Sequence, residues 1–298
     1  LFKYNASYVI INIVYHRGEN DMKKSFPLLI AGCLIFVSLF GAAACSKDED
    51  ADLKKDAHKI SASAEDNICE HCGKKLYEGE IEYTLSDNQK YYIAEISRAD
   101  GDVIVPGYYK DLGEEDYLPV LEVAVPENYA SSACSFDSLE FSATVEHISI
   151  VHLSGNFAGE IKVPEKNKHY KSIDGVLFNK AGTKLVYYPS NLEQTSYTVP
   201  ASVEEIGKLA FSRPDNLKKI QLSENGNLKK ISSQAFYRCE KVESIIIPKS
   251  VETIENEAFA TWSWTVYVRF KENEIPDGWG NVFINGSNTK IVYGYTGE

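Results

Sequence analysis

The chain has 298 residues, of which 44% are hydrophobic and 12% aromatic, so it has enough apolar side chain to bury a large core. Its formal net charge of -12 argues against a general nucleic-acid binder, because the phosphate backbone attracts basic surfaces. The aromatic content also excludes a wholly disordered chain.

The first residues of the chain have the features of a delivery signal. Residues 1–21 begin with Leu and contain no apolar run long enough to span a bilayer, so we interpret them as upstream translation. Residues 22–44 have the three parts of a secretion signal peptide. Met22 is followed by two lysines, an apolar stretch extends from Phe26 to Phe40, and alanines fill 42–44. We therefore expect the chain to be exported.

The cysteine after these alanines is the expected anchor. The order of small residues before Cys45 resembles the lipobox of bacterial lipoproteins, in which this thiol receives the lipid, although Ala42 stands where the motif usually has Leu. The acidic stretch 46–50 resembles the tether of lipoproteins that reach the outer surface of some Gram-negative bacteria. The resemblance implies a lipid-anchored protein of the bacterial cell envelope, at the outer-membrane surface. Ordinary cleavage nearby and an uncleaved membrane helix over 26–44 are the alternatives.

Residues 45–79 are predicted to comprise the lipidated cysteine, a flexible linker and a CxxC segment. Cys69 and Cys72 have the spacing of half a zinc knuckle, but no second CxxC follows them. His58 and His71 could add ligands, and neither spacing requires it. A local disulfide, or a dithiol without metal, is the alternative in an oxidising compartment. We therefore predict no metal and no cofactor, with Cys69 and Cys72 as weak candidates.

A phrase of apolar, any, apolar, Pro recurs through the body of the chain. Alternating apolar residues that end at Pro predict a short strand with one buried face, because Pro has no N–H for a continuing ladder. The phrase occurs five times, at 103–106, 123–126, 161–164, 197–200 and 245–248.

A longer repeat covers 203–270, where three successive turns share six apolar positions. The first shift between equivalent residues is 25 and the second is 23. A unit of this length cannot close its own core, so neighbouring turns must cover one another, and residues 80–298 are predicted to form a solenoid. The matched sets are Val203, Ile206, Ala210, Phe211, Ile220 and Leu222; Leu228, Ile231, Ala235, Phe236, Ile245 and Ile247; and Val251, Ile254, Ala258, Phe259, Val268 and Phe270.

The stretch 245–254, followed by Ala258 and Phe259, resembles the leucine-rich repeat of the BspA-like bacterial surface proteins. Residues 170–189 are similar to the β-hairpin that these proteins insert between repeats, and 271–298 resemble their C-terminal cap. The resemblance is most specific over 160–298. It implies a mainly β repeat solenoid of leucine-rich-repeat type, with one short parallel strand per ~23-residue turn, short helical turns and an inserted β-hairpin.

The residues that alternate with the buried positions of the strands should face outward together. Among them Ile246, Tyr267 and Arg269 have the composition of a recognition hot spot. The alternative is an ordinary surface, where single exposed apolar residues are normal. The predicted face comprises Lys162, Thr198, Lys219, Gln221, Ser244, Ile246, Tyr267 and Arg269.

No nucleophile elbow, phosphate-binding loop or zinc-protease motif occurs in the sequence, so we predict no enzyme activity. The resemblance implies a cell-surface protein that binds a protein or another cell-surface macromolecule, as in adhesion, and that contacts the membrane through its lipid. Nucleic acid is not an expected partner. A structural envelope lipoprotein without a dedicated ligand, and a metal or redox module at the CxxC segment, are the alternatives.

Overall fold

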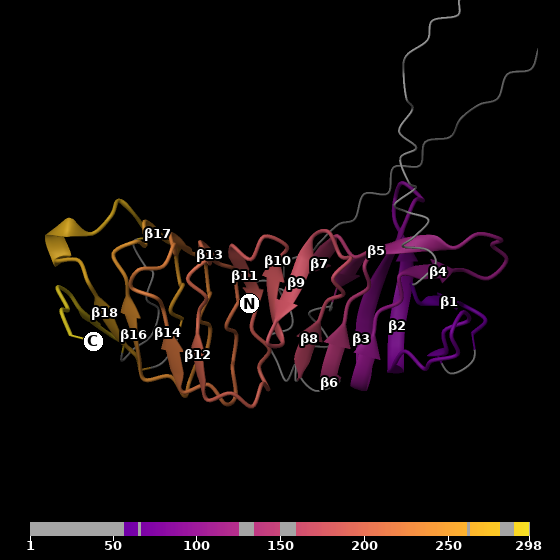
Figure 1. Ribbon diagram of the computed structural model, residues 1–298, viewed down its shortest axis with the longest axis horizontal. Coiled ribbons are helices and arrows are strands. Elements are labelled where there is room, and N and C mark those ends of the chain that lie inside the picture. Colours follow the sequence, from indigo (N-terminus) through magenta and orange to yellow (C-terminus); the bar gives the residue numbers. More distant parts are fainter. Residues whose placement is uncertain are drawn as a thin grey trace, which may run out of the picture. The chain divides into compact units, whose positions relative to one another are not determined.

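The computed structural model describes residues 57–64, 67–124, 134–149, 159–260, 263–280 and 289–297, all of which belong to one compact unit over 47–298. These residues form a mainly β solenoid of about 7 turns, as predicted (Figure 1). Within the described ranges there is no α-helix, and 3-10 helix η3 spans Glu272–Glu274. No helix in this part of the chain could span a membrane. The signal peptide and Cys45 lie outside the described residues.

The N-terminal part of the solenoid is an 8-stranded sheet. Strands β2 and β3 form an antiparallel hairpin, whereas β3 pairs in parallel with β5 and β6, and β6 pairs in parallel with β8. The strands are β1 (Lys59–Ser61), β2 (Glu78–Leu85), β3 (Tyr92–Ile104), β4 (Tyr108–Lys110), β5 (Leu118–Ala124), β6 (Cys134–Glu140), β7 (His147–Ser149) and β8 (Glu160–Lys162).

The described part of the segment predicted as linker and CxxC packs against this sheet. Strand β1 pairs with β4 in parallel, and Ile60, Cys69, Leu76 and Tyr77 are buried in the core of the N-terminal sheet. The sequence predicted a flexible linker before the CxxC segment. The described residues 57–64 instead include β1, because the edge strand β4 supplies its backbone partners and the core of the sheet covers Ile60.

The predicted hairpin is an antiparallel meander of β9 (Tyr170–Ile173), β10 (Val176–Asn179) and β11 (Lys184–Tyr187). Its second turn contains Gly182 at φ +78°, a left-handed conformation that suits glycine. The Asn179 side-chain oxygen accepts hydrogen bonds from the amides of Gly182, Thr183 and Lys184. This asparagine therefore fixes the turn that leads into the repeats.

Each regular turn contributes two short parallel strands. One ladder extends the meander through the two-residue strands β13 (Glu205–Ile206), β15 (Lys230–Ile231), β17 (Thr253–Ile254) and β19 (Gly278–Trp279). The other side consists of two ladders, β12 (Ser196–Thr198) with β14 (Lys219–Gln221), and β16 (Ser244–Ile247) with β18 (Thr265–Val268) and β20 (Lys290–Val292). Of the predicted strands before Pro, those at 197–200 and 245–248 overlap β12 and β16 of these two ladders, whereas the three earlier ones overlap β3, β5 and β8 of the N-terminal sheet.

The short helical turns expected from the resemblance are replaced by single turns around a left-handed residue. Leu209, Gln234 and Glu257 have φ of 56°, 55° and 59°, and each directly precedes an Ala-Phe pair. The amides of two of the Phe residues bond to the next turn: Phe211 N donates to the Ala235 oxygen at 2.7 Å, and Phe236 N donates to the Ala258 oxygen at 2.9 Å. Bonds between turns take the place of the bonds along the chain that a helix would need.

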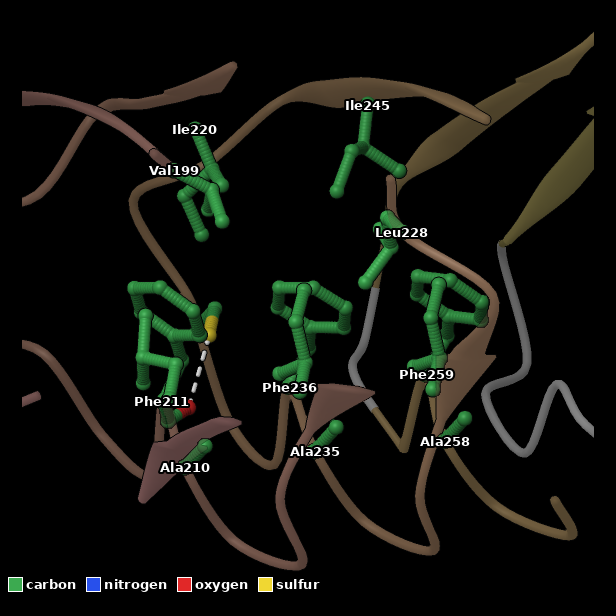
Figure 2. Packing of buried hydrophobic residues seen from close by; sticks show 14 of the residues in the cluster. Val199, Ala210, Phe211, Ile220, Leu228, Ala235, Phe236, Ile245, Ala258 and Phe259 are labelled. Atoms are coloured by element: carbon green, nitrogen blue, oxygen red, sulfur yellow. Dashed lines mark hydrogen bonds between the residues drawn. The ribbon is translucent and has the colours of Figure 1, made fainter. Parts of the chain in front are cut away.

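An aromatic row fills the centre of the repeats. Phe211 stacks on Phe236 with ring centroids 5.4 Å apart, and the buried Ala210, Ala235 and Ala258 lie beside the row (Figure 2). The row begins at Tyr188, whose ring centroid lies 5.2 Å from that of Phe211. The sequence comparison of the three turns did not include Tyr188. The buried Cys239 thiol donates to the Phe211 carbonyl oxygen at 3.0 Å, the dashed line of Figure 2.

The predicted repeat register is correct at the first ladder and wrong at the last strand. Ile206, Ile231 and Ile254 are direct partners, as the shifts of 25 and 23 require. At β18, however, Ile245 pairs with Val266 and Ile247 with Val268, a shift of 21. The segment between Phe259 and the strand is two residues shorter than in the preceding turns, so Phe270 falls beyond the strand.

Candidate functional site

Six of the eight predicted face residues lie on neighbouring strands of the repeats. Thr198, Lys219 and Gln221 come from β12 and β14, whose central residues are buried while the flanking ones are exposed. Ser244 and Ile246 come from β16, and Tyr267 comes from β18. Strands β14 and β16 are in contact, which brings the two ladders into one outward face. We call this surface the repeat face.

The repeat face contains a hollow of about 390 Å³. Its lining includes five of the predicted residues and one from the C-terminal segment: Lys219, Gln221, Ser244, Ile246, Tyr267 and Tyr295. Aliphatic and aromatic side chains thus lie beside an ammonium, an amide and a hydroxyl. Such a combination of an apolar floor with a few polar groups is typical of binding sites.

The apolar part of the hollow continues into the C-terminal segment. Ile246 is the register partner of Tyr267, and Tyr267 is the register partner of Val292, which is 38% exposed. The Tyr295 ring lies 4.3 Å from that of Tyr267. Val292 and Tyr295 were not predicted, although the two-residue period of β20 places Val292 on the same face as Lys290.

The polar part of the face is linked across strands. Thr198 is the register partner of Gln221, and its hydroxyl donates to the Gln221 side-chain oxygen at 3.3 Å. Lys219 is the register partner of Ser196, and both are exposed. The charge of Lys219 therefore stands at the edge of the hollow, open to solvent.

Arg269 does not lie open on this face, contrary to the prediction. Its side chain is only 11% exposed, and its guanidinium donates to the Tyr295 carbonyl oxygen at 3.2 Å and pairs with Glu224 at 3.3 Å. The cation also lies 5.4 Å from the centre of the Tyr295 ring. Strand β18 ends at Val268, so alternation no longer governs the next residue. Arg269 holds the C-terminal segment in place.

Lys162 is separated from the other predicted residues. It lies on β8, which pairs with β6 in the N-terminal sheet, and the β9–β11 meander follows it before the first repeat strand. Its ammonium pairs with Glu160 at 2.9 Å and donates to Ser138 at 3.2 Å. The recurring phrase that includes Lys162 marks a strand, but it does not indicate which sheet receives that strand.

A second cluster forms at the CxxC segment. His58 lies beside Cys69 and Cys72, with one donor atom of each residue within 4.8 Å of the others. Cys69 is buried, Cys72 is exposed, and both are free thiols. Burial opposes ionisation of Cys69, but hydrogen bonds from the Lys59 and Cys72 amides and from the His58 ring lower the pKa to about 6. The sequence suggested either histidine as a possible neighbour, and the structure selects His58.

Residues 183–293 match the sequence profile of the family described as "BspA type Leucine rich repeat region", in 6 copies. No curated protein matches the chain. Solved structures with a similar arrangement include a leucine-rich repeat protein from Eubacterium ventriosum ATCC 27560, with 18% identity over 65% of this chain and 72% of that chain and a TM-score of 0.34.

A leucine rich cell surface protein from Faecalibacterium prausnitzii A2-165 is 17% identical over 67% of this chain and 63% of that chain, with a TM-score of 0.36. The pneumococcal vaccine antigen PcpA is 14% identical over 74% of this chain and 98% of that chain, with a TM-score of 0.33. Because these scores are low, the family assignment rests on the profile match and on the repeat geometry. Residues 183–293 are therefore a leucine-rich repeat region of the BspA type.

Proposed function

We propose that this chain is a non-catalytic, lipid-anchored protein of the bacterial cell surface, and that its repeat face binds a protein on another cell or in a surrounding matrix. The observation that carries the proposal is the hollow on the repeat face, where Ile246 and Tyr267 lie beside Lys219 and Gln221. Tyr anchors in a partly desolvated hollow are the usual source of binding energy in protein interfaces.

The proposed placement at the surface comes from the sequence. The signal peptide over 22–44, Cys45 and the acidic stretch 46–50 support export and lipid attachment. The composition of 46–56, rich in Asp and Lys, is typical of a linker, which would give the repeat face room to stand away from the membrane. The face is polar at one edge and apolar at the other, which favours a protein partner over a lipid surface.

The experiment replaces both anchors, as Ile246→Ser with Tyr267→Ser, and measures binding of the purified chain to whole cells and to immobilised matrix proteins. Removing a hot spot worth about 2 kcal/mol or more should weaken binding by about 30-fold. Arg269 is left intact because it holds the C-terminal segment. Ile173→Ser is the matched control, since Ile173 is an exposed isoleucine on β9, outside the hollow.

Loss of binding in the double variant, with an unchanged melting curve and full binding by the control, supports the proposal. Equal binding by all three proteins would contradict it. If the wild-type chain binds no cell and no matrix protein, the structural envelope lipoprotein becomes the better account.

A further inference from the structure

The cluster at the CxxC segment lies outside the repeat face and has no part in the proposed binding. We propose that His58, Cys69 and Cys72 form a zinc site at the edge of the N-terminal sheet, with the fourth tetrahedral position open to water.

The donor atoms already have nearly the spacing that an ion requires. All three lie within 4.8 Å of one another, and Cys72 Sγ is 3.4 Å from His58 Nδ1. With Zn–S near 2.3 Å and Zn–N near 2.0 Å, a tetrahedral ion holds its donors about 3.3–3.8 Å apart. Small side-chain rotations would therefore close the site, without movement of the backbone.

The backbone around the two cysteines is a tight hairpin. Cys69 N donates to the Lys74 oxygen, and Gly73 N donates to the Cys69 oxygen, both at 2.8 Å. Gly73 has φ +70°, a left-handed conformation that suits glycine and reverses the chain directly after Cys72. The hairpin thus presents both sulfurs to the same side, which a flexible linker would not do.

The surroundings of Cys69 suit a thiolate ligand. The Lys59 amide donates to Cys69 Sγ at 3.4 Å, and amide hydrogen bonds of this kind orient a metal-bound sulfur and offset its charge. Cys69 is also shielded from solvent within the core of the N-terminal sheet. A buried sulfur beside an exposed one gives the ion a fixed attachment and an open approach.

His58 is held in place by the neighbouring strand. His58 directly precedes β1, which pairs with β4. Its carbonyl oxygen accepts a hydrogen bond from the amide of Gly107 at 2.9 Å. The third ligand thus comes from a separate segment, which is hydrogen-bonded both to Gly107 and to the cysteine hairpin, where Glu70 N donates to the Lys59 oxygen at 3.0 Å. A bound ion would tie β1 to the hairpin at the end of the solenoid, where repeat proteins need a cap.

The donor set selects the class of ion. Two thiolates with one imidazole favour zinc over calcium or magnesium, which prefer oxygen ligands. Three protein ligands with one open position also differ from the closed four-ligand sites of zinc fingers. The ion would therefore remain in exchange with solvent and with strong chelators.

The test uses the full chain, reduced and freed of metal, with zinc and cobalt as the probes. We expect about one zinc ion per chain in a chelator competition, and cobalt binding with the charge-transfer bands of thiolate ligation. Cys72→Ser and His58→Ala should each weaken metal binding by more than about 100-fold. Even the loss of a residue that only hydrogen-bonds to a metal ligand lowers the metal affinity by roughly 10- to 100-fold. His71→Ala is the control, because His71 is exposed in the same hairpin but lies outside the cluster.

Retention of binding in the His71 variant and its loss in the other two support the site. Cys72 is exposed, so its replacement should leave the fold intact, and the far-ultraviolet circular dichroism spectrum checks this. A reduced wild-type chain that binds neither metal would overturn the proposal. Wild-type affinity in the Cys72 or His58 variant, or a Cys69–Cys72 disulfide whose reduction restores no metal binding, would overturn it equally.

Discussion

The rings of Phe236 and Phe259 stack almost face to face, with centroids 5.1 Å apart and planes 6° from parallel. The same two turns are joined beside the rings, where Phe236 N donates to the Ala258 oxygen at 2.9 Å. The ring stack and this hydrogen bond therefore add to the strand ladders that join one turn to the next. Stability should spread along this row, because each repeat is covered only by its neighbours.

Phe236→Ala should remove the central ring of the row. Truncation of a buried Phe leaves a cavity between Phe211 and Phe259, and we expect the free energy of unfolding to fall by about 3–5 kcal/mol. Urea titration followed by circular dichroism measures the loss. The control Leu112→Ala, at a side chain that is 71% exposed, should change stability by no more than about 0.5 kcal/mol. Equal midpoints for Phe236→Ala and wild type would show that the row is not built as described.

Tyr188→Phe should stabilise the protein. The Tyr188 hydroxyl is buried and has no hydrogen-bond partner among the described residues, so its removal relieves a desolvation cost of about 1 kcal/mol. Its neighbour Tyr187 is the matched control, because its hydroxyl is hydrogen-bonded to Ser190. Tyr187→Phe should lower stability by about 1 kcal/mol. Thermal melts that shift in the same direction for both variants would contradict this contrast.

Alkaline pH should unfold the repeats. Burial raises the pKa of Tyr188 from 10.0 to about 12, and burial also raises the pKa of Tyr187 and of Tyr197. The unfolded chain therefore releases these protons first, so their contribution to stability is complete below pH ~10 and is lost as the pH rises toward about 12. The urea midpoint should fall over this window, together with the rise of tyrosinate absorbance. A midpoint that stays constant between pH ~10 and about 11.5 would count against these buried hydroxyls.

Asn167 should be essential where the N-terminal sheet meets the meander. Its buried amide donates to the carbonyl oxygens of Ser142 and Val145 at 3.0 and 2.9 Å, and its side-chain oxygen accepts two backbone amides at 2.8 Å. Asn167→Ala leaves these backbone groups without partners, and we expect a loss of about 2–4 kcal/mol. Chemical denaturation of this variant, compared with Asn225→Ala at an exposed position, measures it. Similar losses in the two variants would show that the network contributes little.

The repeat itself could be predicted from the sequence because its signals are local. The Ala-Phe pairs and the apolar residues before each Pro mark where every turn crosses the core. The register error at Val268 has a physical cause, since a shift by two residues keeps the same side chains facing inward. Val266, Val268 and Phe270 alternate equally well in either register, and only the pairing with Ile245 decides between them.

The parts of the site that could not be predicted depend on contacts distant in the sequence. His58 joins Cys69 because the cysteine hairpin folds back on the start of β1, where Lys59 is hydrogen-bonded to Cys69 and Glu70, and no spacing within 58–72 indicates that contact. Arg269 is turned toward Tyr295 by the C-terminal segment, which a strand pattern cannot show. The sequence groups Lys162 with the repeats because residues 161–164 have the same apolar, any, apolar, Pro phrase, but its strand β8 belongs to the N-terminal sheet.

The repeat face can meet a partner on another cell only if it reaches the outside of the envelope. Protease treatment of intact cells that carry the full-length chain tests this directly, with detection of what remains on the membrane. We expect the repeats to be removed from intact cells, while a periplasmic protein used as a marker stays whole. Protection of the repeats until the outer envelope is breached would contradict the account and would favour a structural lipoprotein of the periplasm.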